Sequence, residues 1–363
     1  HLSAGGVSVV IHAPTGQVPT VQYWGAALGE VPAAQLAEIV ATGIAPVVSN
    51  STDHPLVVSV LPEQSRGWMG QQGLHGNRRG RGYGSKFAAV RSTLQTKDLP
   101  AQQAAHLTIQ CDDDGLNLGL VLEFVLTRAG LLQVRATVEN RDDTEFELDG
   151  LNLFLPVPTS ATHLLDFSGR HMRERSPQRT PFNLGSRLRE GRRGRTGVDS
   201  PLLMIAGTAN FGFRSGEVWA THLGWSGNYR MVAERSSEGI SIIGGGELLL
   251  SGEVRLPPAG TYTTPWQFFS YGTGLDDMAA KYHAYLRAGQ AYPDRPRPIT
   301  LNTWEAAYFD QSLEKFESLI AAGAEVGAER FVLDDGRTTF RWRGETPPGI
   351  SALHNTDTPQ SHP

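Results

Sequence analysis

The residues best suited to chemistry lie at the ends of two short predicted strands. One strand ends in Trp304-Glu305 and the next in Asp334-Asp335-Gly336. In parallel α/β folds, ligand-binding groups gather at the carboxyl ends of strands, so these segments are expected to meet. An indole beside carboxylates suits a sugar, which stacks on the indole and donates hydroxyl hydrogen bonds to the carboxylates. A structural interpretation is equally good on spacing alone: Trp304 would close a barrel end, and the aspartates would cap the next helix.

A strand–helix–strand unit is predicted to position these side chains. Residues 299–304 and 331–335 read as strands, and the segment between them is long enough for a parallel crossover. Asp310 or Ser312 would cap the intervening helix. The apolar residues of this helix follow helical spacing: Leu313, Phe316, Leu319, Ile320 and Ala324. Two strands cannot close a barrel, so the second domain begins here without being completed.

The first 270 residues have a β pattern. Apolar residues alternate over 116–126 and 132–138, on either side of a turn at 128–130, which predicts a hairpin with one buried face. Similar runs recur at 146–157, 216–224, 239–243 and 247–256. Because helical periodicity is almost absent, the region is expected to be mainly β, a large antiparallel sandwich over residues 1–272.

The pattern changes after the sandwich. Residues 273–297 are predicted to hold a helix, which ends near Gly289, and a Pro-rich linker. The second domain then spans 298–336. Residues 337–363 show no periodicity, and we interpret them as a disordered tail or as sequence foreign to the fold.

Composition narrows the class of protein. The 363 residues are 39% hydrophobic and 19% charged, which is typical of a folded chain. The net charge of −5 argues against nucleic acid as a partner, and no apolar run reaches the roughly 18 residues that span a membrane. Cys111 is the single cysteine, so no disulfide can form within the chain. Together with an N-terminus unlike a signal peptide, this favours a cytoplasmic location.

Other candidate groups favour structural roles. Residues 170–195 hold nine Arg and only two acids, and residues 66–97 hold seven basic residues and none. A phosphorylated or acidic sugar is one possible partner, but we favour pairing with acids at a subunit or domain interface. No metal or cofactor is expected, because the isolated histidines lack ligand spacing. Cys111 lacks a neighbouring base that would activate its thiol.

Four motifs, in order along the chain, resemble glycoside hydrolase family 36 α-galactosidases. The resemblance covers residues 1–336. The motifs are Gly216-Glu217-Val218-Trp219 with Trp225-Ser226-Gly227-Asn228, then Thr264-Pro265-Trp266, then Asn302-Thr303-Trp304-Glu305-Ala306-Ala307-Tyr308-Phe309-Asp310, and finally Leu333-Asp334-Asp335-Gly336. The resemblance implies an N-terminal β-supersandwich followed by the start of a (β/α)₈ barrel, and retaining hydrolysis of α-galactoside oligosaccharides such as melibiose and raffinose.

The resemblance also implies site residues. Trp304 would form a wall of the galactose pocket, and Asp334 and Asp335 would accept hydrogen bonds from the 4- and 6-hydroxyls. In tetrameric relatives a sandwich loop reaches a neighbouring subunit's pocket. The corresponding stretch here is residues 73–80, with Arg78 as the best candidate contact. A homo-oligomer, either a tetramer or a dimer, is therefore expected of the intact family.

The sequence departs from the family pattern after Gly336. The family's catalytic nucleophile, in a Lys-Trp-Asp motif, and its acid/base aspartate have no counterpart, and Arg337 stands where Trp is expected. Asp334 and Asp335 are poor substitutes, because adjacent strand residues point to opposite faces. No catalytic residue is therefore assigned. The chain is expected to be an inactive fragment, shortened or frameshifted after residue 336.

Two alternatives remain open at this stage. The chain is either a piece of a retaining α-galactosidase or a non-catalytic carbohydrate-binding or assembly module. A related enzyme acting on α-N-acetylgalactosamine or raffinose-type substrates is a third interpretation.

Overall fold

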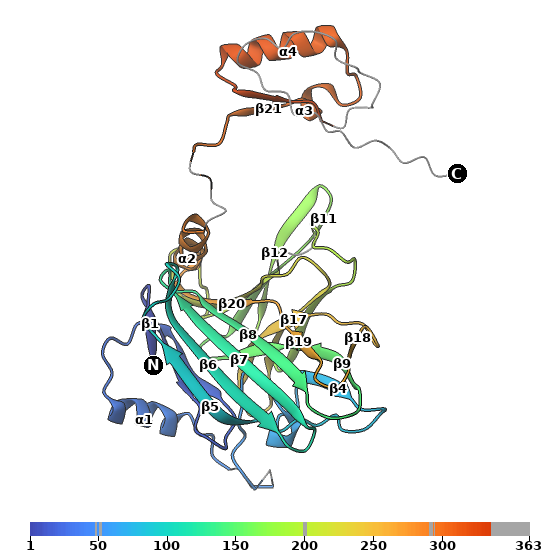
Figure 1. Ribbon diagram of the computed structural model, residues 1–363. Coiled ribbons are helices and arrows are strands. Elements are labelled where there is room, and N and C mark those ends of the chain that lie inside the picture. The colour runs from blue at the N-terminus through green and yellow to red at the C-terminus, as the bar shows by residue number, and fades with distance from the viewer. Residues whose placement is uncertain (48, 51–52, 199–201, 290–292, 294, 335–363) are drawn as a thin grey trace. The chain divides into compact units, whose positions relative to one another are not determined.

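The alternating segments of the sequence form a ten-stranded antiparallel sheet (Figure 1). The computed structural model describes residues 1–47, 49–50, 53–198, 202–289, 293 and 295–334. Along the sheet the strands are β12 (Arg173–Pro181), β11 (His163–Arg170), β14 (Leu203–Gly207), β15 (Glu217–Leu223), β20 (Gln267–Thr273), β8 (Leu132–Asn140), β7 (Leu118–Thr127), β6 (Gln103–Asp113) and β5 (Ala88–Gln95), and β19 (Thr261–Thr263) also pairs with β8. The predicted hairpin is the β7–β8 pair, in which Leu126 lies opposite Leu132.

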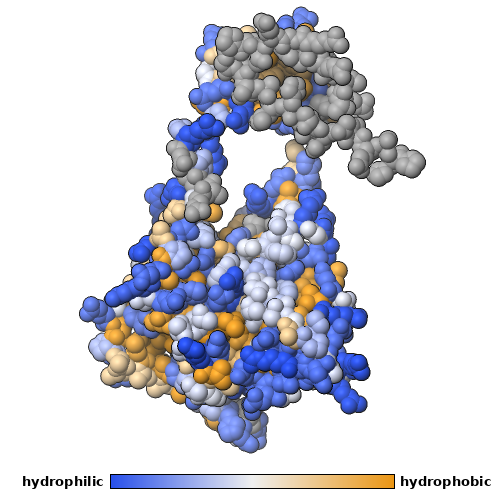
Figure 2. All heavy atoms as spheres, in the orientation of Figure 1, coloured by the Kyte–Doolittle hydropathy of each residue, from blue (hydrophilic) through white to orange (hydrophobic). Residues whose placement is uncertain are grey.

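A second antiparallel sheet completes the sandwich. Its order is β10 (Leu153–Val157), β17 (Ser241–Glu247), β16 (Tyr229–Arg235) and β13 (Gly185–Gly191). Buried residues of both sheets belong to one core, including Phe124 and Val134 of the large sheet and Leu155 and Ile243 of the small one. Figure 2 shows hydrophobic residues reaching the visible surface in separated patches, as expected when most large apolar side chains lie in the core. The predicted antiparallel sandwich is confirmed.

Two smaller sheets flank the sandwich. One contains β1 (Leu2–Ala4), β2 (Val7–His12) and β3 (Thr20–Ala26), and the other contains β18 (Val254–Leu256), β9 (Phe146–Leu151) and β4 (Leu74–Asn77). The run 247–256, predicted as one strand, is interrupted by a turn at which Gly252 has a φ of 73°. Left-handed backbone of this kind breaks an extended strand.

Helix α1 (Ala33–Thr42) corrects the expectation that this region lacks helical periodicity. Its apolar residues Leu36, Ile39 and Val40 do follow helical spacing, but they are only half-buried. Ten residues give too short a pattern to stand out from the surrounding strands. Among the described residues, no helix combines the length and apolar character needed to cross a bilayer.

Helix α2 (Leu275–Arg287) matches its predicted position and packs on the sandwich. Met278 is buried against Val218 and Ala220 of β15, and Tyr282 joins the same cluster. The chain divides into two compact units, His1–Gly289 and Gln290–Pro363, so α2 belongs with the sandwich.

The second unit contains the predicted strand–helix–strand element. Strands β21 (Thr300–Asn302) and β22 (Arg330–Val332) are parallel neighbours, joined through α3 (Trp304–Ala307) and α4 (Leu313–Glu325). Ser312 is the N-cap of α4, and its hydroxyl accepts a hydrogen bond from the Lys315 N–H at 3.4 Å. Of the two predicted caps, Ser312 is therefore the one used. The predicted disordered tail, 337–363, lies outside the described residues.

We expect a chain ending at Gly289 to fold with the same melting temperature as the sandwich in the full chain. A chain ending at Gly272 should melt several degrees lower, because removal of α2 exposes Val218 and Ala220, and each buried apolar side chain contributes about 1.5–3 kcal/mol. Differential scanning calorimetry compares the three chains. Loss of cooperative melting in the chain ending at Gly289 would contradict independent folding of this unit.

Candidate functional site

The parallel pairing of β21 and β22 brings the two predicted site segments together. Asn302 lies opposite Val332 in the register, and the Thr303 N–H donates to the Val332 carbonyl at 3.1 Å. Just past the strands, the Asp334 N–H donates to Oγ1 of Thr303 at 3.1 Å. The structure therefore places Asp334 beside the segment that begins with Trp304, as the sequence predicts.

Trp304 starts α3 within an aromatic cluster. Its ring makes edge contacts with Tyr308 and Phe309, at centroid distances of 5.3 and 5.2 Å. Phe309 is 70% exposed, whereas the indole of Trp304 is half-buried. The carboxylate of Glu305 accepts a hydrogen bond from the Tyr308 hydroxyl at 3.1 Å and raises the pKa of that phenol. Glu305 is therefore engaged by Tyr308.

Asn302 links the backbone at Trp304 to the carboxylate of Asp334, a role that the sequence analysis missed. Its Oδ1 accepts a hydrogen bond from the backbone N–H of Trp304 at 2.8 Å, and its Nδ2 donates to Oδ2 of Asp334 at 2.8 Å. Gln311 also contacts the segment, donating to the Asp334 carbonyl at 3.1 Å. The sequence did offer one sign of this role: Asn302 lies at a strand end, two residues before Trp304. Asp335, the remaining predicted aspartate, lies outside the described residues.

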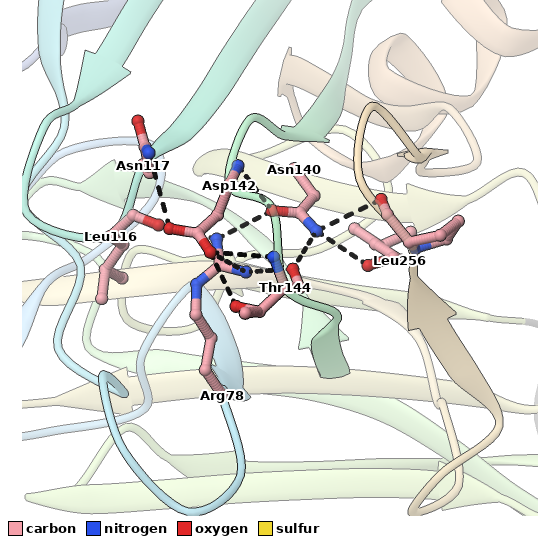
Figure 3. Close-up of polar contacts among 8 residues, drawn as sticks. Arg78, Leu116, Asn117, Asn140, Asp142, Thr144 and Leu256 are labelled. Carbon is pink, nitrogen blue, oxygen red and sulfur yellow. Dashed lines mark hydrogen bonds and ion pairs between the residues drawn. The ribbon is translucent and has the colours of Figure 1, made fainter.

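Arg78 lies in the sandwich unit, held by its own chain (Figure 3). Its Nη1 donates to the Thr144 carbonyl at 2.8 Å, and its Nη2 donates to the Leu116 carbonyl and to Oδ1 of Asn140, both at 2.8 Å. The guanidinium also lies 5.2 Å from the Phe146 ring centroid. A ligand contact by Arg78, which stays a prediction, would compete with these bonds.

Asn140 and Asp142 organise the loop around Arg78. Nδ2 of Asn140 donates to the carbonyls of Thr144 and Leu256, each at 2.8 Å. The N–H and hydroxyl of Thr144 donate to Oδ1 of Asp142 and lower the pKa of that carboxyl. Every dashed contact of Figure 3 is thus internal to the sandwich unit.

The chain thus combines a β-sandwich with a parallel β/α unit that has an indole and a carboxylate at its strand ends. The sequence matches the Glycosyl hydrolase family 36 N-terminal domain over residues 17–257 and the Melibiase family over residues 261–353. The chain therefore belongs to glycoside hydrolase family 36.

Curated relatives support this assignment. The chain is 33% identical over 294 residues to an α-galactosidase of Escherichia coli, covering 80% of this chain and 40% of that protein. It is 30% identical over 250 residues to α-galactosidase AgaA of Geobacillus stearothermophilus, covering 67% of this chain and 34% of that protein. The chain thus spans less than half the length of these relatives.

Solved structures show the same fold. The crystal structure of AgaA from Geobacillus stearothermophilus has a TM-score of 0.78 at 23% identity, covering 92% of this chain and 49% of that chain. An AgaA variant in complex with raffinose has a TM-score of 0.78 at 24% identity, with the same coverage. The supersandwich and the start of the barrel are confirmed as the architecture.

Proposed function

We propose that this chain supplies the galactose-binding end of an α-galactosidase pocket. The observation that carries the proposal is the placement of Trp304 and Asp334 at the ends of adjacent parallel strands, joined by Asn302. The indole offers an apolar face to the sugar ring, and the carboxylate accepts hydroxyl hydrogen bonds. Asp335 is proposed as a second acceptor for the same sugar.

Asn302 gives Asp334 a fixed orientation in this proposal. Its amide occupies Oδ2 of Asp334 at 2.8 Å and leaves Oδ1 as the acceptor for a ligand hydroxyl. Among the described residues, Asp334 accepts no hydrogen bond from a cationic side chain. The site therefore suits a neutral, hydroxyl-rich ligand better than an anionic one.

The proposed reaction of the whole protein is retaining hydrolysis of terminal α-linked galactose. Support comes from the family, and from relatives whose structures hold stachyose and raffinose. Melibiose- and raffinose-type oligosaccharides are the proposed substrates. Retaining hydrolysis requires two carboxyl groups about 5–5.5 Å apart. The sequence lacks the Lys-Trp-Asp motif that holds the family's nucleophile, so this chain contributes binding rather than bond cleavage.

We also propose a homo-oligomer and a cytoplasmic location for the whole protein. Cys111 is buried and free, and burial raises the pKa of its thiol to about 12. An unreactive thiol is compatible with a reducing compartment. Sedimentation velocity and cell fractionation of the whole protein test the two proposals separately.

Galactose is expected to bind the full chain only in the millimolar range. Two or three hydrogen bonds of about 0.5–1.5 kcal/mol each, with one stacking contact of about 1 kcal/mol, barely exceed the association cost. Saturation-transfer NMR should show stronger signals from galactose than from glucose, and Trp304→Ala should abolish them. Phe213→Ala, which alters another exposed aromatic ring on the sandwich, is the matched control. Equal signals from wild type and Trp304→Ala would exclude this site as the galactose pocket.

A further inference from the structure

A cavity of about 470 Å³ lies in the sandwich unit beside β12. Its lining includes Arg175 of β12, Thr196, His222 of β15 and Trp225. The volume falls within the roughly 300–1,000 Å³ range of small-molecule pockets. Figure 1 shows the hairpin of β11 and β12 projecting from the body of the sandwich, and Arg175 is part of this hairpin.

Backbone hydrogen bonds hold the three lining segments together. The Arg175 N–H donates to the Val198 carbonyl at 3.2 Å, and the Thr196 N–H donates to the Ser226 carbonyl at 3.2 Å. Arg175 also has a φ of 49°, a left-handed conformation that is uncommon for a residue with a side chain. The cavity wall is therefore built by tertiary contacts, and Arg175 keeps a strained backbone within it.

Trp225 presents a fixed aromatic surface. The indole is 38% exposed, and a Cβ placed on Gly227 would lie 2.5 Å from its Nε1. The ring is therefore packed on the Gly227 backbone. Deeper in the wall, the imidazole of His222 lies between Phe268 and Tyr282, with centroid distances of 6.3 and 6.0 Å.

The two chain segments that contribute Arg175 and Thr196 to the cavity carry arginines that lack neutralising partners among the described residues. Arg173, Arg175, Arg193 and Arg195 are exposed, and none of them forms an ion pair among the described residues. Four further arginines are paired: Arg187 and Arg189 with Asp166, and Arg192 and Arg230 with Glu190. Pairing of basic loops with acids therefore accounts for only part of this region's charge.

We propose that this cavity binds a sugar carrying an anionic group, either a phosphate or a carboxylate. The sugar ring would stack on Trp225, and the anionic group would lie at Arg175, whose guanidinium geometry matches either group. Thr196, which also lines the cavity, would complete the polar contacts. Nucleic acid fits less well, because the net charge of the chain is −5 and a strand requires successive aromatic platforms.

Titration calorimetry of the full chain tests the proposal with four probes. Galactose 6-phosphate or galacturonate should bind at least tenfold more tightly than galactose and than inorganic phosphate, and the tighter of the two identifies the anionic group. This affinity should fall as salt is added, because exposed charges are screened. Arg175→Gln and Trp225→Ala should each reduce it at least tenfold.

Two variants provide controls. Arg170→Gln removes another exposed cation of the same hairpin, but Arg170 is absent from the cavity lining, so affinity should be unchanged. Trp304→Ala, which disrupts the proposed galactose pocket, should also leave this affinity unchanged. Arg175→Asn, which removes the same charge with a residue that tolerates left-handed backbone, serves as the second variant if Arg175→Gln fails to fold.

Three outcomes would overturn the proposal. If neither galactose 6-phosphate nor galacturonate binds more tightly than galactose, the cations have no role in binding. Inorganic phosphate binding as tightly as the better anionic sugar would show an anion patch without a sugar site. An equal loss of affinity in Arg170→Gln and Arg175→Gln would show that the charge of the hairpin acts without the cavity.

Discussion

The 363-residue chain alone is expected to release no nitrophenol from 4-nitrophenyl α-galactoside above the rate without protein. A retaining mechanism needs one carboxyl as nucleophile and a second as acid/base. Of the two aspartates at the strand ends, the structure describes Asp334, and its Oδ2 already accepts a hydrogen bond from Asn302. Loss of a nucleophile lowers kcat by roughly 10⁶ in a well-studied hydrolase, which puts the expected rate within the blank.

A full-length family 36 α-galactosidase, assayed at the same molar concentration, provides the positive control. The matched negative control is Trp304→Ala, which removes the proposed sugar-binding indole and should give the same blank rate. Turnover above the blank that disappears in Trp304→Ala or Asp334→Asn would show that this chain holds a complete catalytic site. The binding-only proposal would then be wrong.

The meeting of Trp304 and Asp334 was predictable because it follows from topology. A strand, a helix of sufficient length and a second strand imply parallel pairing, which brings the strand ends together whatever the details of packing. The bond between Asn302 and Asp334 was not predictable in this way, because an amide that is free to rotate has several partners within reach. Its geometry depends on the turn into α3.

Arg78 illustrates the limit of reasoning from local sequence. Its acceptors on Leu116, Asn140 and Thr144 are 38, 62 and 66 residues away along the chain. Only the completed sandwich brings these groups together, so the loop sequence alone gave no sign that the guanidinium is held internally. The same holds for residues 170–195, where the paired and unpaired arginines are indistinguishable by composition.

Asp166 is the acidic partner of two arginines in residues 170–195. The composition of that stretch could not reveal it, because Asp166 precedes the stretch in the sequence. It lies on β11 and is 2% exposed. The guanidinium of Arg187 donates to its oxygens at 2.7 and 3.2 Å, and that of Arg189 donates at 3.1 and 2.8 Å. Because Arg187 and Arg189 belong to β13, this ion cluster joins the ten-stranded sheet to the four-stranded sheet.

Asp166→Ala is expected to lower the free energy of unfolding by about 2–4 kcal/mol. Breaking a buried ion pair typically costs about 3–5 kcal/mol, and the lower figure here reflects partial solvation of the two guanidinium groups, which are 34% and 27% exposed. Urea titration at pH 7 measures the change. Asp276→Ala, which removes the acid of an exposed ion pair with Arg214, should cost at most about 1 kcal/mol.

The pH dependence separates the charge of Asp166 from its packing. Burial alone would raise the pKa of this carboxyl, but the two guanidinium groups outweigh burial and hold the pKa below its ordinary value. The charged group therefore stabilises the fold fully above the unfolded pKa of about 3.9, and this contribution is lost as the pH falls through the folded pKa. The difference in stability between wild type and Asp166→Ala should shrink progressively below about pH 4. A difference that stays constant down to pH 2 would mean that the side chain acts through packing. A triple variant, Asp166→Leu with Arg187→Met and Arg189→Met, removes all three charges. If it restores the stability, the uncompensated cations cause the loss in Asp166→Ala.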